Sequence, residues 1–227
     1  MGMVPLISRI THDREVSAAL AFAQQGRHLV VGNLGLLGEA VRRGATVEAH
    51  WSLNALNAAS VEELARMGAD RVWLSPELTG RQLAEVAGAC AAETGTAVYG
   101  RQEVMVTEHC VLMAEGECDR RCGSCARRTG ERSLKDRKGY LFPVRTDITG
   151  RSHVFNSVHL DLGDSLAEVL ATGVSAVRVD VHTLPPGNAA RAVARMRDAL
   201  TLVLAGRPAT VVRDGQATSG HFFRGIS

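Results

Sequence analysis

Short apolar runs alternate with amphipathic stretches along most of the chain, a pattern typical of strand-helix units around a parallel sheet. The apolar runs predict strands at residues 6–10, 29–32, 47–50, 71–74, 96–99 and 176–179. Helical periodicity predicts helices at residues 14–25, 36–43, 61–67, 81–92 and 189–204. Residues that favour helix starts precede three of these helices: Ser60, Thr79 and Asn188. Glycines that favour helix ends stand before strands at Gly44, Gly68, Gly95 and Gly173.

The repeat is interrupted between residues 101 and 160. Four cysteines come first, and β-rich runs at residues 140–145 and 153–158 then flank a turn at residues 147–150. This pattern predicts an insertion with a cysteine loop and a β-hairpin. The strand-helix pattern then resumes, and a last short strand is expected at residues 210–213. The fold class is therefore α/β with one domain over residues 1–227. An open sheet and a partial TIM-type barrel both fit these strands, which are fewer than the eight of a closed barrel.

Charge is unevenly distributed along the chain. The net charge is only +2, but residues 117–151 hold ten Lys/Arg against five acids, so this segment carries +5. A basic insertion suits an anionic substrate, although a solvated loop that offsets negative thiolates fits equally well. The chain shows neither a secretory leader nor an apolar stretch that approaches about 18 residues. We therefore expect a cytoplasmic protein without a membrane span.

The four clustered cysteines have the spacing C-x7-C-x3-C-x2-C, at Cys110, Cys118, Cys122 and Cys125. Crowded thiolates repel one another unless a cation neutralises them, so this spacing predicts a metal centre. One loop with unequal gaps favours a [4Fe-4S] cluster over zinc, which usually takes two separated CxxC pairs. Two disulfides are the alternative, and they would need an oxidising compartment. The fifth cysteine, Cys90, shares a helical face with apolar residues and is expected in the core.

Polar residues follow the predicted strands, where active groups gather in parallel α/β sheets. These residues are Asn33, Asn54, Asn57, Glu77, Arg101, Glu103, Asp180 and His182. The cysteine loop follows the predicted strand at residues 96–99. We therefore expect the loop over the same edge of the sheet, close to Glu77 and Arg101. Glu77 also fits a helix N-terminus, and the asparagines also fit loop backbone groups.

Several motifs resemble the collagenase-like peptidases, peptidase family U32. They are Tyr99-Gly100-Arg101, Glu108-His109-Cys110, the cysteine cluster, Leu134 to Tyr140 with Phe142-Pro143, Asn156-Ser157, Trp51 to Asn54, Leu74 to Leu78, and Gly220 to Gly225. The resemblance implies a partial or complete TIM-type barrel, of which this chain has only the later part. Family members normally begin with a further barrel segment that this sequence lacks. The resemblance therefore also implies that a partner chain could complete the barrel.

The resemblance also implies chemistry. Well-understood relatives resemble [4Fe-4S] proteins that hydroxylate RNA bases or a quinone precursor without molecular oxygen, with prephenate as the oxygen source. The peptidase mechanism of the family is tied to no clear nucleophile. Many relatives place a ligand cysteine where this chain has Gly150-Arg151, so Cys122 or Cys125 would take its place here.

Three functions remain open from the sequence. The first is an iron-sulfur hydroxylase of RNA bases or a related aromatic substrate. It would use Glu77 and Asp180 for protons, and Asn54, Arg101, Arg137 and Asn156 for substrate. The second is proteolysis, although the chain has no G-x-S-x-G or H-E-x-x-H motif. The third is a non-catalytic, metal-stabilised binding module.

Overall fold

The computed structural model describes residues 4–209 and 215–225. Its main sheet has parallel strands in the order β1 (Leu6–Ile7), β2 (His28–Val31), β3 (Thr46–Ala49), β4 (Ala69–Trp73), β5 (Glu93–Gly100) and β11 (Ala176–Val179). A short strand, β10 (Leu160–Asp161), runs antiparallel beside β5. The α/β class with a parallel sheet is therefore confirmed. The strand expected at residues 210–213 lies outside the described residues.

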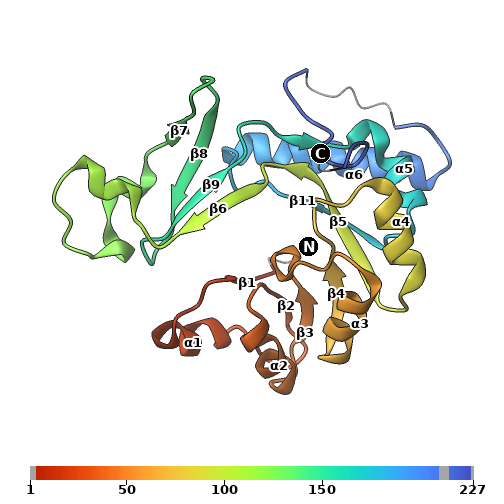
Figure 1. The fold of residues 1–227 in the computed structure, drawn as a ribbon, viewed down its shortest axis with the longest axis horizontal. Coiled ribbons are helices and arrows are strands. Elements are labelled where there is room, and N and C mark those ends of the chain that lie inside the picture. Colours follow the sequence, from red (N-terminus) through yellow and green to blue (C-terminus); the bar gives the residue numbers. More distant parts are fainter. Residues whose placement is uncertain (1–3, 210–214, 226–227) are drawn as a thin grey trace.

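Helices connect successive strands and cover one side of the curved sheet (Figure 1). They are α1 (Asp13–Leu20), α2 (Leu34–Arg42), α3 (Ala58–Arg66), α4 (Gly80–Ala89), α5 (Leu166–Ala171) and α6 (Pro186–Leu204). Within the part of the chain that the structure describes, no helix is both long and apolar enough to cross a lipid bilayer.

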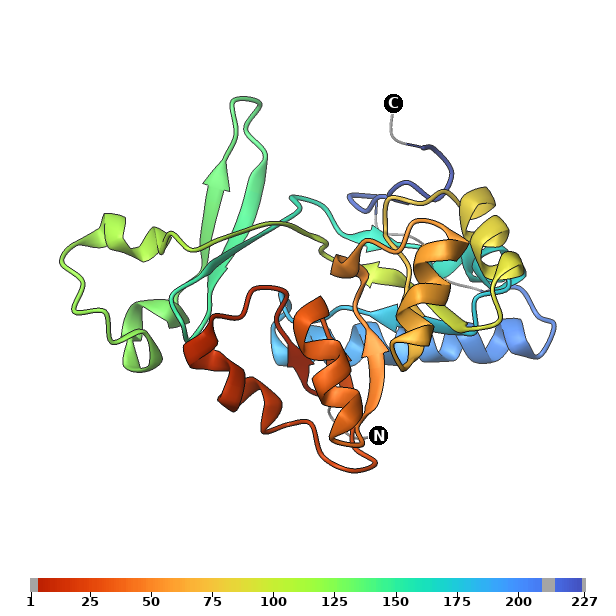
Figure 2. The ribbon, with the colours of Figure 1, turned by 60° about the horizontal axis from the view of Figure 1, so that its bottom comes forward.

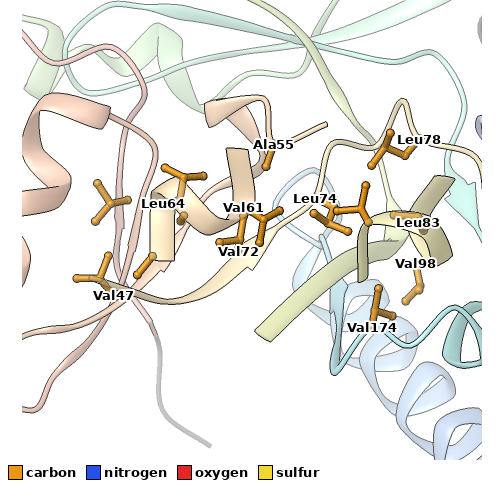
Figure 3. Packing of buried hydrophobic residues seen from close by; sticks show 14 of the residues in the cluster. Val47, Ala55, Val61, Leu64, Val72, Leu74, Leu78, Leu83, Val98 and Val174 are labelled. Atoms are coloured by element: carbon orange, nitrogen blue, oxygen red, sulfur yellow. The ribbon is translucent and has the colours of Figure 1, made fainter. Parts of the chain in front are cut away.

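The core lies between the sheet and these helices. Alternate strand residues point into it, because side chains of a strand alternate between its two faces. Buried examples are Leu29, Val31, Val47, Ala49, Val72 and Val98. Figure 3 shows Val61 of α3 beside Val72 of β4. Cys90 packs against the edge of this core, as expected.

The opposite face of the sheet carries charged side chains together with apolar and aromatic ones. Arg71 Nη1 donates a hydrogen bond to Glu48 Oε1 (3.0 Å), and Trp73 Nε1 donates one to Glu48 Oε2 (2.8 Å). Strands β1 and β11 at the two ends of the parallel array do not pair with each other in the described residues. The sheet is therefore open here, and the partial barrel and a partner chain that completes it stay predictions.

Three details of the expected helix ends are wrong. Helix α3 begins at Ala58, because Asn57 Oδ1 accepts a hydrogen bond from the Ser60 N–H (2.9 Å) and caps the helix in place of Ser60. Helix α6 begins at Pro186, so Asn188 lies inside it. Gly95 lies within β5, beside the Trp73 ring, rather than at a helix end. Thr79 caps α4 as expected.

The insertion forms a separate antiparallel sheet, here called the insert sheet. Its strands stand in the order β6 (Glu103–Thr107), β9 (Ser152–Phe155), β8 (Leu141–Thr146) and β7 (Arg132–Lys135). The expected hairpin corresponds to β8 and β9, whereas β6 and β7 were not predicted. The cysteine loop connects β6 to β7. Figures 1 and 2 show the insert sheet at one end of the molecule, with the β7–β8 hairpin projecting away from the main sheet.

Candidate functional site

A cavity of about 410 Å³, here called the pocket, lies where the parallel strands end. His50 follows β3, Arg101 follows β5, and Asp180 follows β11, and all three line the pocket. The insert sheet contributes a further wall through His153 and Phe155. The carboxyl ends of parallel strands are where α/β folds place ligands, so this pocket is the candidate active site.

Gly100 allows the ends of β5 and β11 to meet at the pocket. Its φ angle is +120°, and a Cβ atom at this position would lie 2.1 Å from the carbonyl oxygen of Asp180. Any other residue would be strained and would push the end of β11 away from β5. The glycine before Arg101 therefore brings Asp180 into the same pocket as Arg101.

A chain of charged groups runs along one side of the pocket. Arg9 forms an ion pair with Glu103, and His153 Nδ1 lies 2.7 Å from the other carboxylate oxygen of Glu103. On its far side, His153 Nε2 lies 3.4 Å from Asp147 Oδ2. These carboxylates, Asp147 first and then Glu103, raise the pKa of His153 to about 9. His153 is therefore a cation at neutral pH and donates from both ring nitrogens.

Two other histidines of the pocket are neutral at the same pH. Burial, followed by the charges of Arg178 and Arg9, lowers the pKa of His50 to about 3. Burial also lowers the pKa of His182, whose ring packs against Phe155 with centroids 4.8 Å apart. His50 Nδ1 accepts a hydrogen bond from the Ser52 N–H (3.4 Å), which assigns the proton of the neutral ring to Nε2.

Arg101 is the cation of the pocket without an acidic partner. Its Nη1 donates to the carbonyl oxygen of Asn156 (2.7 Å), and no ion pair involves it among the described residues. Burial lowers the pKa of its guanidinium. The neighbouring Arg178, by contrast, donates from Nη2 to Asp180 Oδ2 (3.0 Å). A half-buried, unpaired guanidinium suits an anionic ligand.

The clustered cysteines line one small cavity, here called the cysteine cavity: Cys110, Cys118, Cys122 and Cys125. All are free thiols, so the disulfide alternative is not formed in this structure. Burial, and then the three neighbouring thiolates, raise the pKa of Cys122. Within the described residues no group of three His, Cys, Asp or Glu side chains is drawn together as ready metal ligands.

The donor chemistry of the cysteine cavity nevertheless fits a metal or cluster. Four soft sulfur donors share one cavity, and the Arg120 N–H donates to Cys118 Sγ (3.4 Å). Arg127 holds the loop by donating to the carbonyl oxygens of Gly116 (3.2 Å) and Glu117 (3.0 Å). Gly150 lies against the sulfurs, since a Cβ atom there would be 2.8 Å from Cys122 Sγ. Gly150, in the segment where the family resemblance implies a further ligand cysteine, is thus beside Cys122.

The pocket and the cysteine cavity lie on opposite faces of the insert sheet. His153 and Phe155 of β9 point to the pocket, so their face is here called the pocket face. The cross-strand pair Thr146 and Ser152 belongs to the other, or cysteine, face. Thr146 lines the cysteine cavity, and Ser152 Oγ accepts a hydrogen bond from the Val111 N–H (3.0 Å). One layer of β-sheet therefore separates the two sites.

The structure brings together only part of the expected polar ring. Arg101, Glu103, Asp180 and His182 line the pocket. Glu77 does not, because the chain turns into α4 there and carries Glu77 to a different groove, beside Thr79 and Phe222. Three other members of the ring, Asn33, Asn54 and Asn57, also lie outside the pocket, as do the expected substrate residues Arg137 and Asn156.

Each of these residues has another place. Asn33 Nδ2 donates to the Arg9 carbonyl oxygen (3.3 Å), and Asn57 caps α3. Asn54 has a left-handed backbone at the end of η1 (Trp51–Leu53). Asn156 offers only its carbonyl oxygen to Arg101, and Arg137 stands exposed at the tip of the β7–β8 hairpin. The expectation that the cysteine loop lies close to Glu77 is therefore wrong, because the two line different cavities.

Sequence reasoning missed three residues of the site. His50 was placed inside a strand, yet β3 ends at Ala49 and leaves His50 at the pocket. His153 was placed in the hairpin without a role. The available signal was the alternation of polar His153 with apolar Val154, which places the two side chains on opposite faces of the strand. Arg9 carries no local signal, because its partner Glu103 is distant in the chain.

Comparison with known proteins gives one result. The model of the family described as Peptidase family U32 matches residues 10–224, which is nearly the whole chain. Searches of curated proteins and of solved structures each gave no match. The pocket at the strand ends and the cysteine-bearing insertion are consistent with the resemblance noted from the motifs. The chain belongs to peptidase family U32.

Proposed function

We propose that this protein is an iron-sulfur-dependent, oxygen-independent hydroxylase of an aromatic substrate, either an RNA base or a quinone precursor. The observation that supports it is the pair of sites on the two faces of the insert sheet. Four free thiols line one side, and a pocket with an unpaired arginine and neutral imidazoles lies on the other. In this arrangement one layer of β-sheet lies between the place proposed for an electron carrier and the place proposed for the substrate.

The four cysteines would hold the cluster, with zinc as the alternative metal. When bound, a [4Fe-4S] cluster supplies electrons one at a time. Arg127 and Arg132 stabilise the loop around the thiols, because Arg127 binds its carbonyl oxygens and Arg132 Nη2 lies 2.7 Å from Glu115 Oε2. Free thiols need a reducing environment, so we place the protein in the cytoplasm.

The pocket would bind the aromatic substrate and an anionic group. Trp51 and Phe155 supply ring surfaces, and Arg101 supplies a cation that no carboxylate neutralises. A carboxylate such as that of prephenate, the oxygen source implied by the family resemblance, would suit this guanidinium. Asp180, held by Arg178, can accept a proton, whereas neutral His50 can donate a hydrogen bond from Nε2.

Proteolysis is the alternative that the family name suggests. Among the described residues that line the pocket there is no Ser, Thr or Cys to act as a nucleophile. The cysteines line the cysteine cavity on the other face of the insert sheet, and none of them lines the pocket. The geometry therefore favours the hydroxylase.

Mass spectrometry tests this proposal in cells grown without oxygen. Nucleosides and quinones are compared between cells that produce the wild-type protein, the Cys118→Ser variant and the matched Cys90→Ser variant. We expect one species that gains an oxygen atom with the wild type and Cys90→Ser but not with Cys118→Ser. Digestion of a protein substrate that survives Cys118→Ser, without any oxygenated species, would favour proteolysis instead.

A further inference from the structure

The pocket face of the insert sheet continues beyond the pocket onto the β7–β8 hairpin. Arg145 lies directly across from His153, and Lys135 lies directly across from Leu141. Arg145 and Leu141 are four residues apart in β8, so they share a face, and the distance between them is about 13 Å. The pocket face therefore runs from His153 past Arg145 to Lys135 at the end of the hairpin.

Four cations on this stretch form no ion pair within the described residues: Lys135, Arg137, Lys138 and Arg145. Four other arginines of the insertion, Arg127, Arg128, Arg132 and Arg151, are neutralised or tied to the backbone. Arg151, for example, contacts both Glu15 and Glu108. The only acid of the hairpin tip, Asp136, accepts hydrogen bonds from the Lys138 and Tyr140 N–H groups (2.9 Å each). The hairpin thus presents unpaired positive charge.

One exposed aromatic ring and one exposed apolar side chain accompany these cations. The exposed fraction is 54% for Tyr140 and 56% for Leu141, although both adjoin a sheet that could have buried them. Figure 2 shows the β7–β8 hairpin free of contacts with the helices of the main sheet. Cations beside an exposed aromatic ring are the combination that binds phosphates and stacks on bases.

We propose that the pocket face and the β7–β8 hairpin bind a single strand of nucleic acid and lead it towards the pocket. Its phosphates would contact Lys135, Arg137, Lys138 and Arg145, and one base would stack on Tyr140. This inference rests on the proposed function only for the hydroxylation of a base in the pocket, and not for the binding of the strand. A cavity of about 410 Å³ admits a single unstacked base but no base-paired duplex.

An anionic lipid surface is a less suitable ligand for the β7–β8 hairpin than a nucleic acid strand. The four residues of the hairpin turn, 136–139, are all polar or glycine, and the apolar Leu134 and Leu141 lie behind them. A loop that enters lipid carries its apolar residues foremost. The order of residues therefore favours phosphates of a flexible strand.

Fluorescence anisotropy with short labelled oligonucleotides tests the inference, with oligoribonucleotide and oligodeoxyribonucleotide arms. The triple variant Lys135→Gln, Arg137→Gln, Lys138→Gln should bind at least tenfold more weakly. Its slope of log K against log salt should fall by about 2, since each phosphate contact on a single strand contributes about 0.7. Tyr140→Ala should weaken binding about tenfold through lost stacking.

Matched controls remove the same charge and the same ring area elsewhere. Arg42, Arg66 and Arg81 are exposed on the outer helices, so their triple Gln variant should bind like the wild type. Phe223, with an exposed fraction of 57%, lies in another groove, and Phe223→Ala should also leave binding unchanged. Equal losses in test and control variants would overturn the inference, because they would reflect net charge alone.

Two further measurements separate this inference from the proposed function. Iron and sulfide are determined for each variant, and vesicles of an anionic phospholipid are offered in parallel. A chain that holds its cluster but binds neither oligonucleotide would overturn the inference and leave the redox proposal standing. A chain that binds an oligonucleotide but holds no cluster would overturn the redox proposal and leave the inference standing. Binding to vesicles but not to oligonucleotides would overturn the inference in favour of a membrane surface.

Discussion

His153 and Glu103 pair across two neighbouring strands of the insert sheet, with His153 Nδ1 2.7 Å from Glu103 Oε2. Asp147 holds the other ring nitrogen, and Arg9 of the N-terminal segment holds the other oxygen of Glu103. Asp147 belongs to the turn whose Gly150 lies against Cys122 Sγ. The pair therefore connects the cysteine cavity, the pocket and the N-terminal segment.

The charged state of His153 should make stability depend on pH. Its pKa is raised from 6.5 to about 9, so its contribution is full below about pH 6.5 and is lost as the pH rises through about 9. A shift of this size corresponds to at most about 3 kcal/mol. His153→Gln should thus lower the free energy of unfolding at pH 6.5, and the difference from the wild type should shrink above pH 9.

Urea denaturation at several pH values measures this difference. His109→Gln is the matched control, because His109 is exposed and its ring has no carboxylate partner among the described residues. A pH-independent difference between wild type and His153→Gln would contradict the charged state assigned to His153.

Arg151 should be essential for attachment of the insert sheet to α1. Its side chain is only 3% exposed and lies 2.7 Å from Glu15 Oε2 and 2.5 Å from Glu108 Oε1. Arg151→Gln removes the buried cation that both carboxylates share, so the loss of two hydrogen bonds to charged groups should lower the free energy of unfolding by about 3 kcal/mol. Arg14→Gln, at an exposed arginine 3.8 Å from Glu15, should cost less than about 1 kcal/mol. Similar losses for both variants would argue against this anchor.

Prediction from the sequence succeeded where the signal is local. Strand β11 was predicted with its observed bounds, because an apolar run after a glycine marks it unambiguously. The placement of Arg101 and Asp180 followed from the rule that strand ends carry the site, and the pocket confirms it. The four cysteines were likewise predicted to share one place from their spacing alone.

The errors come from interactions between distant segments or from local caps. Glu77 follows a strand, but Ser75 Oγ accepts from its N–H and Thr79 caps α4, so the chain turns away from the pocket. Arg9 and Glu103 are 94 residues apart, and no pattern in either segment announces the pair. The two faces of the insert sheet depend on strand register, which the sequence of a hairpin fixes only in part.

Gly150 should tolerate no side chain, because of its contact with Cys122. Both Gly150 (φ +93°) and Gly26 (φ +70°) have a left-handed backbone, but a Cβ atom at Gly26 meets nothing within 4 Å. Gly26→Ala should therefore cost about 1 kcal/mol from backbone strain alone. Gly150→Ala should cost about 1 kcal/mol more and lower the metal content, as measured by denaturation and by elemental analysis. Equal effects of the two variants would exclude a close contact with Cys122 Sγ.

Arg101 should decide the affinity of the pocket for small aromatic carboxylates. Quenching of Trp51, one of two tryptophans in the chain, reports binding of 4-hydroxybenzoate or prephenate. A hydrogen bond to a charged group is worth about 1.5–3 kcal/mol, so Arg101→Gln should weaken binding at least tenfold. Arg207→Gln, near the end of α6, should bind like the wild type, and Trp51→Phe should abolish the signal. Unchanged affinity of Arg101→Gln would remove the proposed anion site.

The content of iron and acid-labile sulfide in the anaerobically purified chain tests the central proposal most directly. We predict about four of each per chain for the wild type and for Cys90→Ser, whose thiol packs against the core. Both should be largely lost when Cys110, Cys118, Cys122 or Cys125 is replaced by Ser. One zinc ion per chain without sulfide, or iron and sulfide that persist in all four serine variants, would contradict a cluster in the cysteine cavity.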